Sequence, residues 1–509
     1  MKLSELISVL DHPKVKGKLD CEVAGLTYDS RGIAPGLLFV AIRGLHQDGH
    51  QFVNQVMAQG AVGVVVENDC PDVLSQTLSR IIRVKDTRRA LSVLAHQFYG
   101  KPSHQMGMIG VTGTNGKTTT TYLIRGILEA AGKKVGLLGT TGYHVGLEVL
   151  PALHTTPESL DLHRLLAEMV QAAIEYTVME VSSHALALGR VSDCAFDVAV
   201  YTNLSQDHLD FHKDMEDYFK AKQKLFSELG IGNPKSFPRR AVVNGDDPKA
   251  SQVIAVTQVP CWTYATDKQA DLTAERIQID FEGIRFLAVT PQGKFEIQSV
   301  LTGRYNVSNI LAAIGVVLSQ DIPIPVIQKG IKNVRQVPGR FEKVQEGQDF
   351  LVIVDYAHTE DALRKLLLAV QELRQSTLSP EGRVLTVFGC GGDRDRGKRP
   401  KIGQVAVGLS DCVILTSDNP RTEDHMAIIR EIEAGIKQGP DTRRQRAGYF
   451  IIPDRAEAIE KAIGLARRGD IVVIAGKGHE DYQIVGPHKI HFDDREVARV
   501  ALRRLKAKS

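Results

Sequence analysis

Short apolar runs alternate along the 509-residue chain with segments whose apolar residues recur at helical spacing. Runs at 38–42, 61–66 and 108–112 have the length and composition that are typical of buried strands. After the third run, apolar residues between 123 and 131 recur three or four positions apart, which predicts a helix that ends near Gly132. The alternation of strands and helices predicts an α/β fold with mainly parallel sheets.

The chain is too long for one hydrophobic core, and its length suggests about three domains. Two stretches with Gly and Pro, 100–103 and 337–340, interrupt the pattern and are candidate linkers. We therefore expect three domains, in order a small α/β N-terminal domain, a central domain resembling P-loop ATPases, and a C-terminal doubly wound Rossmann-like domain. Their expected boundaries are 1–98, 99–336 and 337–509.

A glycine-containing loop lies between the third apolar run and the predicted helix. Its glycines allow backbone N–H groups to approach an anion, and the helix N-terminus adds partial positive charge. Lys117 can reach the outer phosphates of a nucleotide, and a hydroxyl at Thr118 or Thr119 can ligate magnesium. Two residues separate the glycines here, where the common P-loop has four, and a plain structural turn is the alternative interpretation. The residues expected to bind ATP are Gly113, Thr114, Asn115, Gly116, Lys117, Thr118 and Thr119.

Two further strands of the central domain end in residues that can bind cations. Glu180 ends the apolar run at 176–179, and His208 follows the run at 199–202. Ligands gather at the carboxyl ends of parallel strands, so both side chains are expected to face the same nucleotide. A carboxylate oxygen and an imidazole can complete a cation shell there. A packed core histidine is the alternative for His208.

Four apolar runs in the last third of the chain each end in a polar loop, at 355–358, 389–395, 417–421 and 476–480. The carboxyl ends of parallel strands lie at one edge of a sheet, so we expect these loops to lie together at that edge. Arg394 and Arg421 would then converge with Asp418, Asn419 and Glu480. Two guanidinium groups can bind a carboxylate, and a carboxylate with an amide can bind an ammonium group. The implied ligand is zwitterionic, like an amino acid, and a surface ion-pair cluster is the alternative.

Two polar segments suggest no chemistry by themselves. The cluster at 27–31 could bind a ligand, but a turn between strands is the favoured interpretation. Lys220, Lys222 and Lys224 lie on a predicted helix, where three lysines usually form a solvated face.

Bulk properties restrict the class of protein. The formal net charge is +3 and no basic tail is present, which argues against nucleic acid as the main partner. No apolar run approaches the roughly 18 residues of a membrane span, and the N-terminus lacks the apolar core of a signal peptide. The six cysteines are scattered without metal-like spacing, which favours a reducing, cytoplasmic location.

A nucleotide site and an amino-acid-like site on separate domains suggest ATP-driven bond formation. A carboxylate is a poor acceptor for an amine, whereas its acyl phosphate carries a good leaving group. The amine attacks the acyl phosphate, and the tetrahedral intermediate collapses to an amide and phosphate. Such a protein mainly positions the reactants and neutralises phosphate charge.

Three motifs, at 113–118, 203–210 and 354–358, resemble those of the Mur ligases, which build the peptidoglycan stem peptide. The resemblance covers essentially the whole chain. Motifs at 179–184, 389–398 and 476–480 are similar to those of the branch that adds the third residue of the stem. The motif at 418–421 resembles the diaminopimelate-adding form, because the lysine-adding branch lacks its arginine.

The resemblance implies an ATP- and magnesium-dependent ligase that adds meso-diaminopimelate to the D-glutamate of UDP-N-acetylmuramoyl-L-alanyl-D-glutamate. Such an enzyme serves cell-wall synthesis, and through it cell shape, the cell cycle and division. Its partners would be these small molecules, with no nucleic acid and no membrane span, and a monomer is expected. Arg394 and Arg421 suit the second carboxylate of diaminopimelate, which lysine lacks.

The resemblance also implies roles for matching residues. The UDP-sugar-peptide would be held by Ser30, Thr155, Thr156, Ser182 and Arg190. Further ATP contacts would come from Asn309, Arg340 and Asp355. Lys222 would be carbamylated, against the solvated-face interpretation, and metal ligands would be Thr118, Glu180, His208 and Lys222. The catalytic set would be Lys117, Glu180, His208 and Lys222. Diaminopimelate would be bound by Arg394, Asp418, Asn419, Pro420, Arg421, Gly476 and Glu480.

One position departs from the family pattern. Leu188 falls where some relatives carry a substrate-binding glutamine, and leucine cannot make that hydrogen bond.

Three alternative functions stay open. The same chemistry could use L-lysine or another amino acid. Folylpolyglutamate synthetases share the phosphate loop but lack the 98-residue leader. An ATP-gated binding protein without activity is disfavoured by the intact set of Lys117, Glu180, His208 and Lys222.

Overall fold

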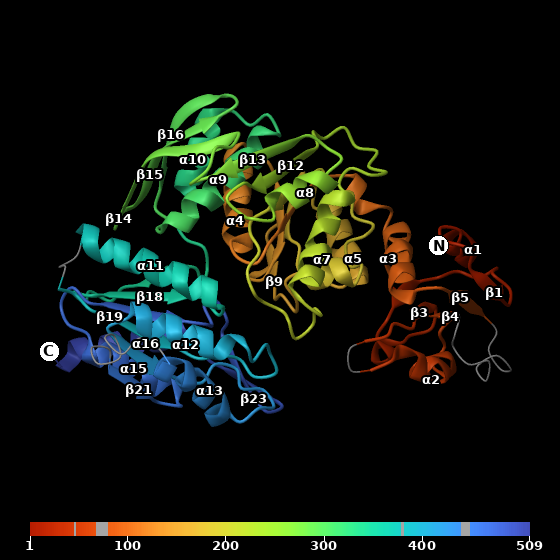
Figure 1. The fold of residues 1–509 in the computed structure, drawn as a ribbon. Helices are drawn as coiled ribbons and strands as arrows, with labels where there is room; N and C mark the ends of the chain where they lie inside the picture. Colours follow the sequence, from red (N-terminus) through yellow and green to blue (C-terminus); the bar gives the residue numbers. More distant parts are fainter. Residues whose placement is uncertain (45–46, 68–79, 378–380, 439–447, 509) are drawn as a thin grey trace.

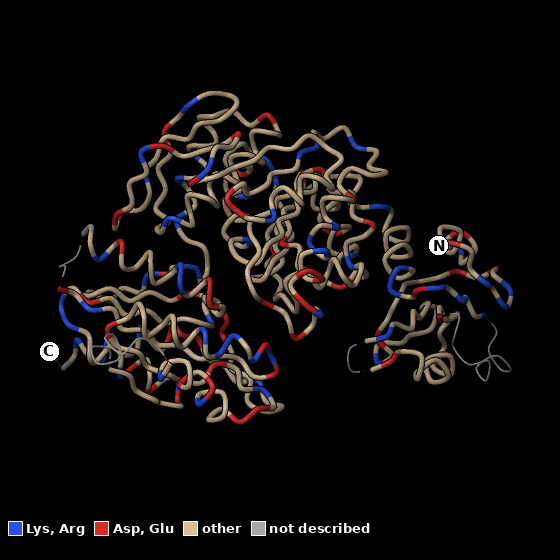
Figure 2. The backbone as a smooth tube through the Cα atoms, viewed as in Figure 1, with Lys and Arg blue, Asp and Glu red and all other residues tan. Residues whose placement is uncertain are grey.

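The structure, a computed structural model, describes residues 1–44, 47–67, 80–377, 381–438 and 448–508. Three α/β units follow one another along the chain, with the N-terminal unit at one end and the C-terminal unit packed against the central one (Figure 1). Basic and acidic residues are interspersed over all three (Figure 2). In the described ranges no helix is long and apolar enough to cross a membrane.

The N-terminal unit is built on a five-stranded sheet in the order β1-β5-β4-β3-β2, parallel except for β1. Helix α3 packs on its core together with α1. The strands are β1 (Lys14–Lys16), β2 (Gly25–Thr27), β3 (Leu37–Val40), β4 (Gly63–Glu67) and β5 (Ile81–Val84). The helices are α1 (Leu3–Ile7), α2 (Val53–Ala58) and α3 (Thr87–Phe98).

The central sheet has eleven strands in the order β16-β15-β14-β13-β12-β11-β6-β10-β7-β8-β9. The strand before the glycine loop, β6, lies at its centre between β10 and β11, and all three are parallel. The strands are β6 (Gly107–Thr112), β7 (Val135–Gly139), β8 (Gly142–Val145), β9 (Glu148–Leu150), β10 (Tyr176–Glu180), β11 (Val198–Tyr201), β12 (Arg240–Asn244), β13 (Cys261–Ala265), β14 (Leu272–Asp280), β15 (Gly283–Thr290) and β16 (Gly293–Ser299).

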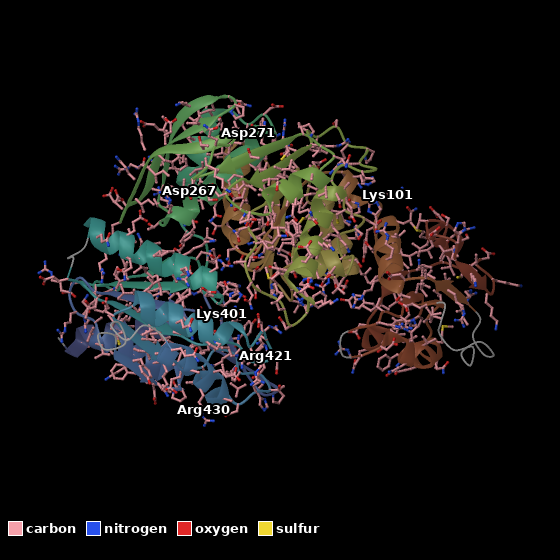
Figure 3. All side chains as sticks on the ribbon, viewed as in Figure 1. Lys101, Asp267, Asp271, Lys401, Arg421 and Arg430 are labelled. Carbon is pink, nitrogen blue, oxygen red and sulfur yellow. The ribbon has the colours of Figure 1, made fainter. Side chains whose placement is uncertain are left out.

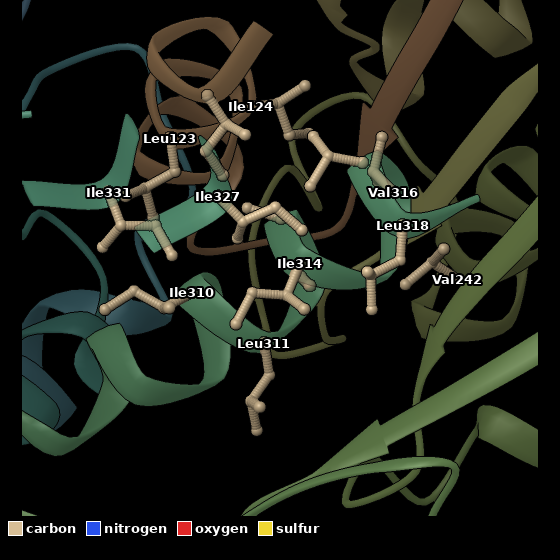
Figure 4. Close-up of a cluster of buried hydrophobic side chains, with 14 of the residues drawn as sticks. Leu123, Ile124, Val242, Ile310, Leu311, Ile314, Val316, Leu318, Ile327 and Ile331 are labelled. Carbon is tan, nitrogen blue, oxygen red and sulfur yellow. The ribbon is translucent and has the colours of Figure 1, made fainter. Parts of the chain in front are cut away.

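Helices cover both faces of the central part of this sheet. On one face α4, α9 and α10 share an apolar core, with Leu123, Ile314 and Ile327 among its members (Figure 4). On the other face α5, α6, α7 and α8 pack over a second core. The helices are α4 (Lys117–Ala130), α5 (Ser159–Gln171), α6 (Ser183–Ala187), α7 (Met215–Ser227), α8 (Ala250–Val256), α9 (Arg304–Leu318) and α10 (Ile324–Asn333).

The central sheet is mainly parallel, as predicted, but both of its ends are antiparallel. The pairs β14–β15, β15–β16, β7–β8 and β8–β9 run antiparallel. In β16 buried and exposed residues alternate, because one face packs on the protein and the other meets solvent. The alternating pattern, unlike the continuous apolar runs of the middle strands, marks these hairpins.

The C-terminal sheet has the order β17-β18-β22-β19-β20-β21. The four strands that precede the polar loops, β18, β22, β19 and β20, are adjacent and parallel, so their loops share one edge, as predicted. The strands are β17 (Glu342–Val344), β18 (Leu351–Asp355), β19 (Val384–Phe388), β20 (Cys412–Leu415), β21 (Gly448–Ile451) and β22 (Ile471–Ala475), with a hairpin of β23 (Tyr482–Val485) and β24 (His488–His491).

Helices also cover both faces of the C-terminal sheet, which is the doubly wound arrangement. One face packs against α11 (Glu360–Thr377), α12 (Lys398–Leu409) and α13 (His425–Gln438). The other packs against α15 (Arg455–Leu465) and α16 (Asp494–Lys508).

Candidate active site

The glycine loop lies between β6 and α4, supported by the end of β11. Gly113 has φ +141°, and a Cβ at this position would clash with Thr202 Oγ1. The Asn203 carbonyl accepts a hydrogen bond from Thr114 N (2.8 Å), and its side-chain oxygen accepts one from Asn115 N (3.0 Å). These contacts hold the loop open at the start of α4, with the geometry of an anion cradle.

Lys117 and Glu180 meet at the first turn of α4. The Lys117 ammonium donates to the carbonyls of Gly113 (2.9 Å) and Thr114 (2.8 Å). Burial lowers the pKa of Lys117, and the nearby Glu180 carboxylate opposes that shift. Glu180 accepts hydrogen bonds from Thr118 Oγ1 (3.1 Å) and Thr140 N (3.0 Å). The carboxylate and the Thr118 hydroxyl therefore lie together where a phosphate-bound cation would be held.

Lys222 is buried, with 2% of its surface exposed, whereas Lys220 and Lys224 are exposed. The solvated-face interpretation is wrong for Lys222, because α7 turns this position toward the glycine loop. The Lys222 amine donates to Gly113 O (2.9 Å) and lies over the Tyr218 ring. Burial, aided by the charge of Lys117, lowers the pKa of Lys222 well below its ordinary value.

His208 follows β11 in the left-handed backbone region, with φ +57°. Its ring lies 4.8 Å from that of His184, centroid to centroid. Burial lowers the pKa of His208 to about 3, so the imidazole is neutral, the form that can ligate a cation. Burial alone would raise the pKa of Asp207, but the neighbouring His358, His208 and Lys398 hold it well below its usual range.

These donors suit a partly hydrated magnesium ion. A hydroxyl, a carboxylate and a neutral imidazole are present at Thr118, Glu180 and His208. Within the described residues no group of three His, Cys, Asp or Glu side chains forms a metal cage. Magnesium usually keeps several waters and binds through one or two carboxylates and substrate phosphates, so the donor set fits that mode.

Residues from the next part of the chain approach the glycine loop from the opposite side. Arg340 donates to Thr118 Oγ1 (3.0 Å), and its guanidinium lies 4.4 Å from the centroid of the Tyr356 ring. The Asn309 amide lies against Gly116, where a Cβ would come within 2.5 Å of Asn309 Oδ1. A cavity of about 190 Å³ opens beside them, lined in part by Thr119, Asn306 and Arg340.

Asp355 acts on the backbone in this arrangement. Its carboxylate accepts hydrogen bonds from Phe341 N (2.7 Å) and Ala357 N (2.8 Å). Burial raises its pKa, and Arg340 with these two N–H groups opposes the shift. Asp355 therefore holds the segment that carries Arg340.

Four of the five residues expected to hold the sugar-peptide lie together beside Glu180. Thr156 Oγ1 donates to Glu180 O (2.8 Å) and accepts from Ser182 N (3.0 Å). Arg190 donates to Thr156 O (3.1 Å), and Thr155 Oγ1 accepts from Thr140 Oγ1 (3.2 Å).

Ser30 lies apart from these four, in the short helical turn η1 (Ser30–Gly32) of the N-terminal unit. Asp29 caps this turn by accepting from Arg31 N (2.9 Å), so the cluster at 27–31 is a turn, as its residues favour. Leu188 caps the C-terminus of α6 through its backbone N–H and offers no side-chain hydrogen bond.

Arg394 and Arg421 converge on Gly391. A Cβ at Gly391 would lie 2.9 Å from Arg421 Nη1 and 3.8 Å from Arg394 Cγ. Burial lowers the pKa of Arg421, and the charge of Arg394 lowers it further, as expected for two close cations. Arg421 has φ +53° and donates to Gly392 O (2.6 Å), whereas Arg394 is half exposed. The two side chains therefore lie close together beside Gly391, and joint binding of a carboxylate by their guanidinium groups stays a prediction.

The other polar residues of these loops form a network next to the arginines. Asn419 Nδ2 donates to Glu480 Oε2 (2.9 Å), and a Cβ at Gly476 would lie 2.7 Å from Asp418 Oδ2. The fully buried Lys477 donates to Asn419 Oδ1 (3.3 Å) and Glu480 Oε2 (3.2 Å). Lys477 is not among the residues predicted from the sequence, although it lies inside the 476–480 motif, because a lysine in a polar loop is usually exposed.

Comparisons with known proteins identify the family of this chain. Three family models match the chain: "Mur ligase family, catalytic domain" at 22–99, "Mur ligase middle domain" at 111–317 and "Mur ligase, glutamate ligase domain" at 339–478. A UDP-N-acetylmuramoyl-L-alanyl-D-glutamate--2,6-diaminopimelate ligase from Geobacillus thermodenitrificans is 46% identical over 503 residues, 99% of both chains. The chain belongs to the Mur ligase family.

Other relatives of this Mur ligase support the same assignment. An equally named ligase from Solibacter usitatus is 46% identical over 505 residues, covering 99% of this chain and 98% of its own. A solved structure with that name has a TM-score of 0.68 at 33% identity, covering 99% of each chain. MurF from Acinetobacter baumannii, at 20% identity and TM-score 0.66 over 93% of this chain and 95% of its own, shares the fold. The predicted family and its α/β architecture are confirmed.

The two halves of the Mur ligase site meet across the junction between the central and C-terminal units. Asn115 Nδ2 in the glycine loop donates to Asp361 Oδ2 on α11 (2.7 Å). Lys398, at the start of α12, lies 3.7 Å from Asp207, with both side chains almost fully buried. Nothing near Asp361 in the chain indicates its distant partner. Lys398 ends the 389–398 motif, but no local feature predicts that it faces Asp207.

A second pair of contacts closes the rim of this junction. Gln206 donates to Asp395 Oδ2 (3.0 Å) and accepts from Lys401 Nζ (2.6 Å). Figure 3 labels Lys401 on the part of the C-terminal unit nearest the central one. Arg394 lies 3.9 Å from Asp210. Neighbouring side chains therefore link the segment around Asp207 to the loop that carries Arg394.

Proposed function

We propose that this Mur ligase adds meso-2,6-diaminopimelate to the γ-carboxylate of the D-glutamate in UDP-N-acetylmuramoyl-L-alanyl-D-glutamate. The observation that carries the proposal is the convergence of Arg394 and Arg421 on Gly391, beside the Asn419–Glu480 pair. Relatives that are 42–46% identical over the whole chain and are named 2,6-diaminopimelate ligases support it.

The charges of the pocket favour diaminopimelate over lysine. Diaminopimelate ends in both a carboxylate and an ammonium group, and the two guanidinium groups can bind that carboxylate. The guanidinium groups of Arg394 and Arg421 would lie next to the distal end of the bound amino acid. Net-neutral diaminopimelate avoids the repulsion that cationic lysine would meet.

The reaction uses ATP as its phosphoryl donor. The D-glutamate carboxylate takes the γ-phosphoryl group and ADP leaves. The unprotonated amine of diaminopimelate then attacks the acyl carbon, the amide C–N bond forms, phosphate leaves, and the amine loses its remaining extra proton. The glycine loop and Lys117 bind and neutralise the phosphates, and Arg340 approaches from the C-terminal side.

Magnesium is part of the proposal. Thr118, Glu180 and His208 are the side chains that would hold it, and bound magnesium would supply positive charge next to the phosphates. Lys222 would join them once carbamylated.

Carbamylation of Lys222 is proposed on the basis of its surroundings. A buried lysine with a lowered pKa loses its proton more readily, and the neutral amine can add to carbon dioxide with loss of a proton to give an anionic carbamate. Among the described residues no carboxylate lies within ion-pair distance of its amine. After equilibration with ¹³C-bicarbonate, we expect a carbamate signal by ¹³C NMR that disappears in Lys222→Ala. A spectrum that is the same with and without Lys222 would contradict it.

The proposal extends to organisation and location. We propose domain boundaries after residues 98 and 336, a monomer, and a cytoplasmic location. The described cysteines are free thiols, which is consistent with a reducing compartment. Ser30, Thr155, Thr156, Ser182 and Arg190 are proposed to hold the UDP-sugar-peptide.

An amino-acid panel tests the substrate assignment. With ATP, magnesium and the UDP-sugar dipeptide, phosphate release is measured with diaminopimelate, L-lysine and other amino acids. We expect diaminopimelate to be preferred, and Arg421→Met to reduce that preference by about 10²-fold. Arg430→Met changes an exposed arginine on α13 and is the matched control. A wild-type preference for lysine would refute the pocket argument, and ATP binding without any product would favour a binding protein.

A further inference from the structure

A completely buried ion pair lies beneath the proposed amino-acid pocket. Arg455 is the first residue of α15 and Asp494 the first of α16, and neither side chain is exposed. Their contact is bidentate: Nε donates to Oδ1 and Nη2 to Oδ2, each at 2.7 Å. The Mur ligase reaction as proposed above assigns no role to this pair.

The guanidinium of Arg455 also binds the two loops of the pocket. Nη1 donates to Ser417 O (3.3 Å), and Nη2 donates to Ala475 O (3.0 Å). These carbonyls immediately precede Asp418 and Gly476, where the two ligand-binding loops begin. One planar side chain, held in orientation by Asp494, therefore contacts the base of both loops.

The strand order shows why such a bridge matters. Strand β19 lies between β20 and β22, so the strands that carry the two loops are not hydrogen-bonded to each other. Above the bridge the loops touch, with the Asn419–Glu480 hydrogen bond and the close approach of Gly476 to Asp418. A change in the loop separation would therefore alter the distance between the groups proposed to bind the amino acid.

We propose that Arg455 is a positioning residue that sets the separation of the 417–421 and 476–480 loops. It thereby determines affinity for the incoming amino acid and discrimination among amino acids, without touching the substrate. The inference rests on the proposed function of these loops. The residues proposed to bind ATP and the UDP-sugar-peptide do not include any in the 417–421 and 476–480 loops, so binding of these two ligands is expected to be independent of Arg455.

Two variants test this inference. Arg455→Lys keeps a positive charge for Asp494 but cannot reach both carbonyls with a planar fork. Removing Arg455 alone would leave a buried charge, so the second variant, Arg455→Leu with Asp494→Leu, replaces the whole pair. In both we expect KM for diaminopimelate to rise about tenfold and the preference for diaminopimelate over lysine to fall, because the carbonyl contacts are lost.

The readout that separates positioning from general damage is the pattern of KM values. KM for ATP and for the UDP-sugar dipeptide should stay unchanged. The control is Arg383→Lys, since Arg383 pairs with Asp470 (2.7 Å) and binds Leu465 O, away from the loops. An unchanged KM for the amino acid, an equal rise for all three substrates, or failure of both variants to fold would overturn the inference. If the wild type prefers lysine, the proposed substrate fails, and the same measurement with lysine still decides the role of Arg455.

Discussion

The central unit meets its two neighbours in different ways. At the N-terminal junction, Leu160 of α5 is part of the N-terminal core. Tyr28 donates to Asp161 (2.7 Å) and Arg88 pairs with Glu158 (3.3 Å). At the C-terminal junction Ile279, Phe281 and Tyr305 of the central unit pack on the C-terminal core. Polar contacts there come from the site itself, as in the hydrogen bond from Arg340 to Thr118.

We therefore expect the N-terminal junction to support the central unit and the C-terminal junction to take part in catalysis. The N-terminal junction buries apolar surface and an ion pair at α5, and none of these residues is expected to bind the phosphates. The C-terminal junction joins Asn115 to Asp361 and Asp207 to Lys398, next to residues that would hold the nucleotide. We expect closure of this junction to assemble the site, because ligands that bind both sides favour the closed arrangement.

The largest effect is expected at Lys117, where the C-terminal junction meets the phosphates. Lys117→Ala should lower the rate of phosphate release by about 10³-fold, because the negative charge of the transferred phosphoryl group is no longer neutralised by a buried cation. Its hydrogen bonds go only to loop carbonyls, so the fold should remain intact. Lys220→Ala, an exposed lysine on α7, is the control. Activity within tenfold of wild type would remove the glycine loop from the mechanism.

The next effect concerns the junction directly. Arg340→Met removes the contact to Thr118 and should lower kcat/KM for ATP by about 10²-fold. It should also weaken closure, which small-angle scattering measures as the change in radius of gyration on adding an ATP analogue and substrates. Arg335→Met changes a neighbouring arginine that lines the same cavity and is the control. A variant that closes like wild type would show that Arg340 binds nucleotide without joining the units.

The fold and part of the site could be predicted from local sequence. A short apolar run defines a strand, and chain direction then brings the ends of parallel strands together, which is how Glu180 meets the loop and Arg394 meets Arg421. Helical spacing could have predicted the burial of Lys222, because the apolar residues three and four positions away share its face, whereas Lys220 and Lys224 lie on another face. These apolar residues are Tyr218, Phe219, Leu225 and Phe226. The Asn115–Asp361 contact joins residues 246 positions apart, and only packing of the units reveals it.

A third test addresses the N-terminal junction through pH. His163 on α5 is fully buried beside His96 of α3, and both of its ring nitrogens lack a hydrogen bond. Burial lowers its pKa to about 3, and the neighbouring His96 and His104 add to the shift. Below its ordinary pKa of 6.5 the unfolded chain binds a proton that the folded chain does not, so stability falls as pH decreases from 6.5 toward 3.

For His163 alone, the free energy of unfolding at pH 5 is expected to be about 2 kcal/mol lower than at pH 8. His163→Leu should therefore flatten the pH dependence of the urea midpoint over that range, whatever it does to stability at pH 8. The exposed His12, changed to Leu, is the control. An unaltered pH slope in His163→Leu would show that this imidazole does not limit acid stability.

The smallest effect is expected for an ion pair of the same junction. Glu158 binds both Arg88 (3.3 Å) and Arg190 (3.2 Å), so Arg88→Met leaves the carboxylate with one partner. We expect KM for the UDP-sugar dipeptide to rise about threefold, and kcat and KM for ATP to stay unchanged. Arg164→Met, at an exposed pair on α5, is the control. A large fall in kcat would mean that the N-terminal junction also takes part in catalysis.

Two side chains of the site come from backbone that ordinary residues avoid. His208 and Arg421 both have positive φ, at +57° and +53°, which costs about 1 kcal/mol compared with glycine. At these positions glycine would raise thermal stability by relieving backbone strain, but it would lower turnover by removing a side chain of the site. Laboratory evolution that selects for survival at high temperature alone should therefore accumulate glycine or asparagine at 208 and 421. Such variants would lose the two side chains that are proposed to bind magnesium and the amino acid.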